Sequence, residues 1–206
     1  MKGKFISFEG IEGTGKSTQA SLLYEWFKGR GLDVVLTEEP GGTQIGVEIR
    51  KLLLSVEHKG MTPLSELLLY NASRAQHIEE IILPAMERGA IVITDRFYDS
   101  TIAYQGYGRG IDLNLLDSID TIVTAGLRPD ITVLLDLDVE IGLKRNRNIN
   151  KTDRLELEDV EFHGRVRRGY HNLAVREPER IKLVHASGDI GDIHKRIVEI
   201  IRDIIH

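Results

Sequence analysis

The chain has 206 residues, no cysteine and a formal net charge of −5, from 27 lysines and arginines against 32 aspartates and glutamates. This excess of acidic residues argues against a protein that binds nucleic acid nonspecifically through its overall charge. The lack of cysteine excludes disulfides, a thiolate nucleophile and cysteine-ligated zinc. No apolar run approaches the roughly 20 residues of a membrane span, and no signal-type apolar core opens the chain. We therefore expect a cytoplasmic protein with a single domain over residues 1–206 that binds neither nucleic acid nor a membrane.

Short apolar segments alternate with longer amphipathic ones along the whole chain. The short segments are rich in β-branched and aromatic residues and are expected to be strands, at 4–8, 34–37, 91–94, 131–135 and 181–184. Among the helical patterns between them, one covers 63–87, where Pro84 should kink or end it, and one covers 190–205. Continuous apolar strands alternating with helices predict an α/β fold with a parallel sheet between two layers of helices.

Residues 10–17 read Gly-Ile-Glu-Gly-Thr-Gly-Lys-Ser, a full match to the phosphate-loop pattern G-x-x-x-x-G-K-[ST]. The segment follows a predicted strand and opens a predicted helix, which is the context that the pattern requires. Backbone N–H groups of such a loop converge on phosphate oxygens, while Lys16 would contact the β- and γ-phosphates and the Ser17 hydroxyl would bind Mg²⁺. These residues predict a nucleoside-triphosphate site.

Asp95 and Arg96 follow the predicted strand at 91–94 and indicate a phosphotransferase. The carboxylate would lie beside the metal and the guanidinium beside an anionic substrate, although the two residues alone are explained equally well as a surface ion pair at a strand end. A GTP-dependent switch is an alternative of another class. Its D-x-x-G pattern is absent, and its N-K-x-D pattern occurs at 150–153, inside a basic segment and not at a strand end. A nucleotide-binding module without turnover is a further alternative.

In this order, the motifs resemble the thymidylate kinase family over nearly the whole chain. Beyond the phosphate loop, the specific pieces are Glu-Pro-Gly-Gly-Thr at 39–43, Asp-Arg-Phe at 95–97 and Ala-Tyr-Gln-Gly at 103–106. The resemblance implies a three-layer P-loop fold with a five-stranded parallel sheet, a homodimer, and Mg²⁺-dependent transfer of the γ-phosphoryl group of ATP to dTMP. A kinase for another nucleoside monophosphate is the nearest alternative.

The resemblance also implies roles for individual residues of the acceptor site. Arg50 and Arg96 would bind the dTMP phosphate, Tyr70 would stack on thymine, and Arg74 and Thr101 would contact the base edge. Taken alone, Arg50 and Arg74 are more simply explained as solvated positions on helices. The expected dTMP site comprises Glu12, Glu39, Pro40, Arg50, Tyr70, Arg74, Arg96, Ser100, Thr101, Tyr104 and Gln105.

Sugar, metal and ATP contacts follow from the same resemblance. Tyr104 would crowd the sugar C2′ and so disfavour ribonucleotides, while Glu12 would lie near the 3′-hydroxyl. Ser17 would bind the metal, and Asp95 would act on it through water. The expected ATP site comprises Gly10, Ile11, Glu12, Gly13, Thr14, Gly15, Lys16, Ser17, Thr18 and Arg145.

A basic stretch from Lys144 to Arg154 stands out in this acidic chain. Related kinases carry an arginine either in the phosphate loop or in a mobile lid, and Glu12 occupies the loop position here, so the chain resembles the lid-arginine type typical of bacteria. We expect a lid over about 144–157, with Arg145 packing on adenine and Arg147 and Arg154 contacting the transferring phosphates. A solvated loop without a catalytic share is the alternative. The expected catalytic set is Lys16, Asp95, Arg96, Arg147 and Arg154.

Overall fold

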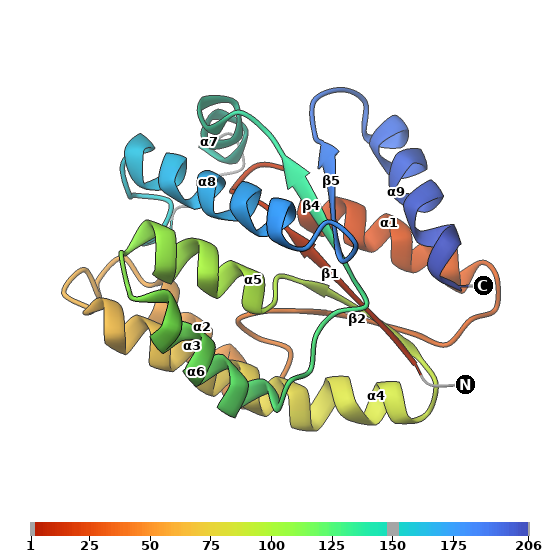
Figure 1. Ribbon diagram of the computed structural model, residues 1–206, viewed down its shortest axis with the longest axis horizontal. Coiled ribbons are helices and arrows are strands. Elements are labelled where there is room, and N and C mark those ends of the chain that lie inside the picture. Colours follow the sequence, from red (N-terminus) through yellow and green to blue (C-terminus); the bar gives the residue numbers. More distant parts are fainter. Residues whose placement is uncertain (1–2, 148–152, 206) are drawn as a thin grey trace.

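The computed structural model describes residues 3–147 and 153–205, and at its centre five parallel strands form one sheet (Figure 1). Each strand pairs with its neighbours in parallel. The spatial order is β2-β3-β1-β4-β5, where the strands are β1 (Lys4–Glu9), β2 (Val34–Glu38), β3 (Ile91–Asp95), β4 (Ile131–Asp136) and β5 (Ile181–His185). The predicted α/β fold with a five-stranded parallel sheet is confirmed.

Helices cover both faces of this sheet, with α1 and α9 on one face and α3, α4, α5 and α8 on the other (Figure 1). None of the described helices is long and apolar enough to cross a membrane. Their bounds are α1 (Lys16–Lys28), α2 (Gln44–Leu54), α3 (Pro63–His77), α4 (Leu83–Glu87), α5 (Tyr98–Thr101), α6 (Leu113–Thr124), α7 (Val139–Arg147), α8 (Val160–Arg176) and α9 (Ile190–Ile205), with two π-helical stretches, η1 (Ile78–Ile82) and η2 (Ile102–Gly108).

The apolar character of the strands follows from burial on both faces. In β1, Phe5 packs into the cluster that includes α3, α4 and α8, whereas Ile6 and Phe8 pack into the cluster beneath α1 and α9. Successive side chains of a strand point to opposite faces, so a strand covered on both sides needs apolar residues at nearly every position. This explains why the strands show continuous hydrophobicity in place of alternation.

The predicted helix over 63–87 is divided into three parts. Thr62 caps α3 by accepting a hydrogen bond from the Ser65 N–H, and Pro63 occupies the first turn, as the pattern predicts. Pro84 does not end the helix: the N–H of Leu83 donates to the carbonyl of Ile78, five residues earlier, and Pro84 then lies in the first turn of α4. Because proline has no N–H to donate, the helix accommodates Pro84 by changing its hydrogen bonds from the i→i−4 to the i→i−5 pattern in the turn before it.

Candidate functional site

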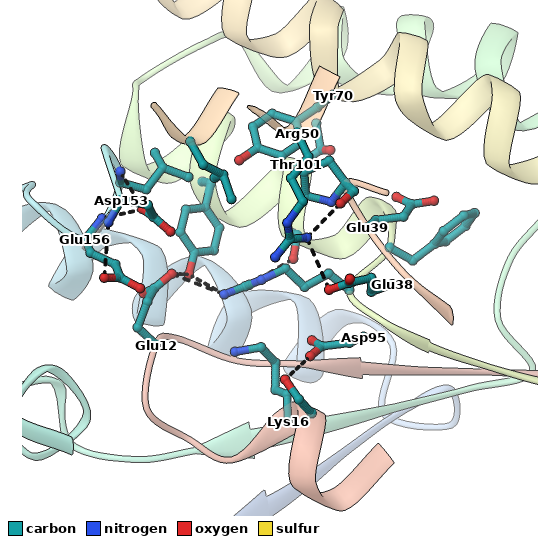
Figure 2. A pocket seen from close by; sticks show the side chains of 18 of the residues that line it. Glu12, Lys16, Glu38, Glu39, Arg50, Tyr70, Asp95, Thr101, Asp153 and Glu156 are labelled. Carbon is teal, nitrogen blue, oxygen red and sulfur yellow. Dashed lines mark hydrogen bonds and ion pairs between the residues drawn. The ribbon is translucent and has the colours of Figure 1, made fainter. Parts of the chain in front are cut away.

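A cavity of about 360 Å³ opens at the carboxyl ends of β1, β2 and β3. Figure 2 shows Lys16 and Asp95 on one side of it and Arg50, Tyr70 and Thr101 on the opposite side. Every residue expected in the acceptor site lines this cavity, namely Glu12, Glu39, Pro40, Arg50, Tyr70, Arg74, Arg96, Ser100, Thr101, Tyr104 and Gln105. From the other expected sets, the lining residues are Gly13, Gly15, Lys16, Ser17, Thr18 and Asp95.

The phosphate loop between β1 and α1 has the backbone conformation that its glycines permit. Gly13 and Gly15 have φ values of 71° and 89°, which disfavour other residues, and Gly15 is the N-cap of α1. The N-terminus of α1 therefore faces the cavity, where backbone N–H groups attract anions. Gly10, Ile11 and Thr14 do not line the cavity; the Ile11 carbonyl accepts a hydrogen bond from the Thr14 hydroxyl at 2.9 Å.

Lys16 is buried at the start of α1, and its Nζ donates to the Ile11 carbonyl at 2.9 Å. Burial lowers the pKa of Lys16 to about 8, and the nearby Arg96 acts in the same direction. Asp95 and Glu12 oppose the shift only in part. The ammonium group is thus held at a position where its charge is costly, a cost that a phosphate ligand would remove.

The side chains of Ser17 and Asp95 meet at the end of β3. The Ser17 hydroxyl donates to Asp95 Oδ2 at 2.5 Å, so that a hydroxyl and a carboxylate lie side by side next to the phosphate loop. Such oxygen donors suit Mg²⁺, which keeps several waters and takes further ligands from substrate phosphates. Within residues 3–147 and 153–205 no group of three or more histidine, aspartate or glutamate side chains is arranged to hold a metal ion. The residues fit a magnesium ion that is bound mainly by water and nucleotide.

Arg96 has a strained backbone and a fully engaged side chain. Its φ is 75°, in the left-handed region, which costs a non-glycine residue on the order of 1–3 kcal/mol and is typical of functional sites. With this backbone conformation, the Arg96 side chain lies in the lining of the cavity. The guanidinium donates to Glu12, Ser100, Tyr104 and Tyr170 side-chain oxygens and to the Gly10 carbonyl, all at 3.1–3.2 Å.

Behind Arg96 lies Glu9, a buried carboxylate at the end of β1 that the sequence interpretation did not assign. It accepts hydrogen bonds from the Phe97 N–H at 2.8 Å, from Ser100 at 2.6 Å and from Tyr170 at 2.8 Å. Burial raises the pKa of Glu9 to about 7, with Asp99 adding to the shift and Arg96 opposing it. The position of Glu9 directly before the phosphate loop could have indicated a site residue. Nothing in the local sequence indicated that Tyr170 on α8 would be its hydrogen-bond partner.

Glu12 is the carboxylate of the phosphate loop, and it pairs directly with Arg96 in the cavity lining. Its Oε1 accepts from the Tyr104 hydroxyl at 2.5 Å and from Arg96 at 3.1 Å, while Oε2 lies 3.3 Å from His163 Nδ1. Burial alone would raise the pKa of Glu12, but His163, Arg96 and Lys16 hold it below its ordinary value. The carboxylate therefore stays ionised in a buried position.

Glu39 organises the end of the cavity formed by the turn after β2. Arg74 is buried and donates to Glu39 Oε2 at 2.8 Å and to Thr101 Oγ1 at 2.9 Å, while His77 Nδ1 lies 2.9 Å from Glu39 Oε1. Arg74 is thus not a solvated position on its helix. Arg50 is half-buried and donates to the Pro40 carbonyl at 2.7 Å.

Two of the three expected lid arginines, Arg145 and Arg154, do not line this cavity. Arg145 donates to the Ala186 carbonyl at 3.1 Å after β5, and Arg147 ends α7 with a side chain that lies outside the described part. Arg154 is buried and forms a 2.6 Å ion pair with Glu66, a fully buried carboxylate that also pairs with Arg109 at 3.1 Å. The expected contact of Arg154 with transferring phosphates stays a prediction.

Residues on either side of Arg154 in the sequence line the cavity. Asp153 and Glu156 border the cavity in Figure 2, and other lining residues missed by the sequence interpretation are Glu38, Leu54, Phe97, Asn146 and Leu155. Phe97 belongs to the Asp-Arg-Phe motif, and four of the others fall within the expected lid at 144–157, although no role was assigned to any of them. Glu38 and Leu54 carry no motif signal and contribute through position alone. Residues 150–152 of the N-K-x-D pattern lie outside the described residues.

Comparisons with known proteins agree with this geometry. The family model described as thymidylate kinase matches residues 8–197. The chain is 52% identical over 200 residues to a thymidylate kinase of Halothermothrix orenii, covering 96% of this chain and 95% of that protein. It is 49% identical over 203 residues to one of Trichormus variabilis, covering 98% and 96%. The crystal structure of thymidylate kinase from Ehrlichia chaffeensis matches with a TM-score of 0.81 and 37% identity, over 98% of this chain and 100% of that chain.

Proposed function

This chain belongs to the thymidylate kinase family, and we propose that the γ-phosphoryl group of ATP passes to dTMP in the cavity at the carboxyl end of its sheet, giving dTDP and ADP. The observation that carries this proposal is the meeting of two anion-binding elements in one cavity. The phosphate loop with Lys16 and the strained, tightly held Arg96 both line it, and Arg96 contacts the loop at Gly10 and Glu12. A donor phosphate and an acceptor phosphate can thus approach each other end to end.

On the donor side, the N–H groups of the phosphate loop and Lys16 hold the β- and γ-phosphates of ATP. Ser17 and Asp95, the latter through water, would hold Mg²⁺, and a bound ion would supply neutralisation of charge on the transferring phosphoryl group. Arg145 and Arg147 remain the candidates for lid arginines, at adenine and at the phosphates respectively. Positive charge from a lid would stabilise the transition state and exclude water.

On the acceptor side, Arg96 and Arg50 bind the phosphate of dTMP. No general base is required, because the attacking phosphate oxygen is already ionised at neutral pH, so catalysis consists of positioning and charge neutralisation. Tyr70 stacks on the thymine ring, and Arg74, fixed by Glu39, contacts the base edge together with Thr101.

The remaining acceptor residues select and orient the deoxyribose. The Tyr104 ring fills the space beside C2′ and thereby disfavours ribonucleotides, while Glu12 accepts the 3′-hydroxyl. Ser100 supports Arg96 at 3.2 Å, and Gln105 donates to Glu66 at 2.8 Å at the base of the cavity. Pro40 adds the carbonyl that orients Arg50.

We also propose that the protein is a cytoplasmic homodimer. Apolar side chains with 46–82% of their surface exposed lie on α2, α3 and α6, and α3 packs against both of the other helices. Within α2 they recur after seven residues and within α3 after four, so the two side chains of each helix share one face, and α6 contributes one residue. These side chains are Ile45, Leu52, Leu64, Leu68 and Ile122. An apolar surface of this kind on a soluble chain is typical of an interface.

Steady-state assays with dTMP, dUMP, dCMP, dGMP and AMP test the reaction. We expect dTMP to have the highest kcat/KM, and we expect Lys16→Ala to abolish turnover. Preference for another acceptor would indicate a different nucleoside monophosphate kinase. Release of ADP that is independent of every acceptor, or no release at all, would indicate a nucleotide-binding module without transfer.

The role of Arg96 has its own test. Arg96→Ala should lower kcat/KM for dTMP on the order of 100-fold or more, since a charged anion clamp is lost, while the Kd for ATP stays within about threefold. Fluorescence titration with an ATP analogue supplies the Kd. If ATP binding is lost as well, Arg96 holds the phosphate loop together and does not act chiefly on the acceptor.

A further inference from the structure

His163 is a fully buried histidine on α8 to which the proposed function gives no role. It lies one residue after Phe162, whose ring it meets edge to face at 5.4 Å between centroids. Its Nδ1 lies 3.3 Å from Glu12 Oε2. The two residues are 151 positions apart in the sequence, so this contact exists only because α8 packs behind the acceptor side of the cavity.

The two oxygens of Glu12 have different surroundings. Oε1 accepts hydrogen bonds from Tyr104 and Arg96, at 2.5 Å and 3.1 Å. Oε2 makes no hydrogen bond within the described part of the chain, and neither does either ring nitrogen of His163, although the two groups are in contact. Buried polar atoms without partners are rare and costly, so the 3.3 Å approach of Nδ1 to Oε2 is the contact that offsets the burial of both groups.

Glu12 Oε2 is fully buried on the side of His163, so Oε1, next to Tyr104 and Arg96 in the cavity lining, is the oxygen for a hydroxyl group in the cavity. Tyr104 and Arg96 hold Oε1 from one side, but two bonds to a single oxygen leave the carboxylate able to rotate about them. His163 blocks that rotation on the other side, because its ring fills the space beside Oε2 and can donate to it. The side chain of Glu12 is 10% exposed, so the accessible part is small and its direction is fixed by its neighbours.

We propose that His163 is a positioning residue that fixes the Glu12 carboxylate in the orientation that accepts the 3′-hydroxyl of the acceptor sugar. This inference rests on the proposed function. It assigns to α8 a share in recognising the deoxyribose, although His163 itself does not touch the substrate. The plain alternative is that His163 only fills space beside Phe162.

A substrate lacking the 3′-hydroxyl separates these two roles. We compare dTMP with 3′-deoxy-dTMP in wild type and in His163→Phe, which preserves ring size and removes the nitrogen donors. Wild type should lose about tenfold in kcat/KM when the hydroxyl is removed, the effect expected of a hydrogen bond to a charged group. In His163→Phe, dTMP should slow by about tenfold and 3′-deoxy-dTMP by less than about twofold, so that the ratio between the substrates nearly vanishes.

Controls on the same residue and the same helix make the result decisive. His163→Asn, which retains a donor, should keep most of the substrate ratio, and His163→Leu should lose it; this pair serves if His163→Phe is too unstable to assay. His171→Phe, two turns further along α8 and 2.8 Å from Asp136, should leave the ratio unchanged. The KM for ATP should stay within about twofold in all variants, because the donor phosphates lie on the other side of the cavity.

Two outcomes overturn the inference. An equal loss for both substrates in His163→Phe would mean that His163 supports the fold and not the orientation of Glu12. If His163→Phe keeps the wild-type ratio of kcat/KM between dTMP and 3′-deoxy-dTMP, Glu12 is held in place without His163. Failure of the wild-type protein to phosphorylate dTMP is a separate result, which would remove the proposed function on which the inference depends.

Discussion

At the scale of single residues, the site depends on charges that are buried and paired. Lys16, Glu12 and Arg96 lie close together in the cavity lining, where Glu12 attracts both cations and the two cations repel each other. Removing one partner leaves an uncompensated charge, which is more costly than losing the pair. This explains why so many side chains of the cavity are already held in place before a substrate is considered.

The lowered pKa of Lys16 gives a pH prediction. A lysine with a pKa of about 8 is protonated below that value and loses its charge as the pH rises through it, whereas bound phosphates favour the protonated form. ATP binding should therefore weaken as the pH rises, by about tenfold between pH 7 and pH 9, and should take up a proton near pH 8–9. Calorimetric titrations in buffers with different ionisation enthalpies measure both effects.

Lys16→Arg supplies the comparison for this prediction. The guanidinium does not titrate in this range, so its ATP affinity should be flat between pH 7 and pH 9 even if it is weaker throughout. Wild-type affinity that is also flat, with no proton uptake, would show that Lys16 keeps an ordinary pKa.

At the scale of elements, the approach of α8 to η2 brings the site together. α8 carries His163 and Tyr170, which contact Glu12 and Arg96, and η2 carries Tyr104. Two glycines allow this approach: a Cβ on Gly169 would meet the Tyr107 ring at 2.8 Å, and a Cβ on Gly108 would meet the Phe162 ring at 2.7 Å. The residues behind the cavity are thus placed by the packing of two helical segments.

Gly164 and Gly169 on α8 form a matched pair that tests this packing. Gly169→Ala should destabilise the protein by about 1–3 kcal/mol, since Tyr107 or the helix must move. Gly164→Ala should stabilise it by up to about 1 kcal/mol, because its nearest neighbour would be the end of the Arg168 side chain at 3.8 Å. Urea unfolding measures both. Equal effects of the two substitutions would mean that α8 and η2 are not closely packed at Gly169.

At the scale of the whole molecule, a net charge of −5 conceals a group of cations at the cavity. One lysine and three arginines line it together with six carboxylates, and ion pairs such as Arg74–Glu39 and Arg96–Glu12 hold these cations in place. Average charge therefore bears on general binding to polyanions, and it says little about small anionic ligands. The apolar face of α2, α3 and α6 is the other feature that appears only at this scale.

Substitution of one residue on that face tests the homodimer. Leu68→Glu places a charge at the centre of the apolar face and should shift the protein from dimer to monomer, because a buried unpaired charge is expensive. Light scattering coupled to size-exclusion chromatography measures the mass. Val175→Glu, at a residue 80% exposed on α8, should leave the dimer intact. A wild-type mass of one chain would contradict the proposed assembly.

Much of this protein can be predicted from its sequence, because the relevant signals are local. The phosphate loop has fixed spacing, and buried strands need continuous apolar runs, so both were predicted within a residue or two of where they lie. Parallel strands end at one edge of the sheet, which explains why Glu39, Asp95 and Arg96 meet there, while the resemblance to a family supplied the rest of the acceptor residues.

Only the tertiary structure decided which partner each buried charge has. Arg154 was expected to contact the transferring phosphates, and in the structure it pairs with Glu66. Glu12 is contacted by His163, which lies 151 residues further along the chain on α8. Such contacts depend on how α8 packs on η2 and how α3 passes beneath the turn at 153–157. The periodicity of a helix shows that one face is buried, but not which residues of another element lie against it. The sequence therefore determined the chemistry and its place on the sheet, and the packing of helices decided its geometry.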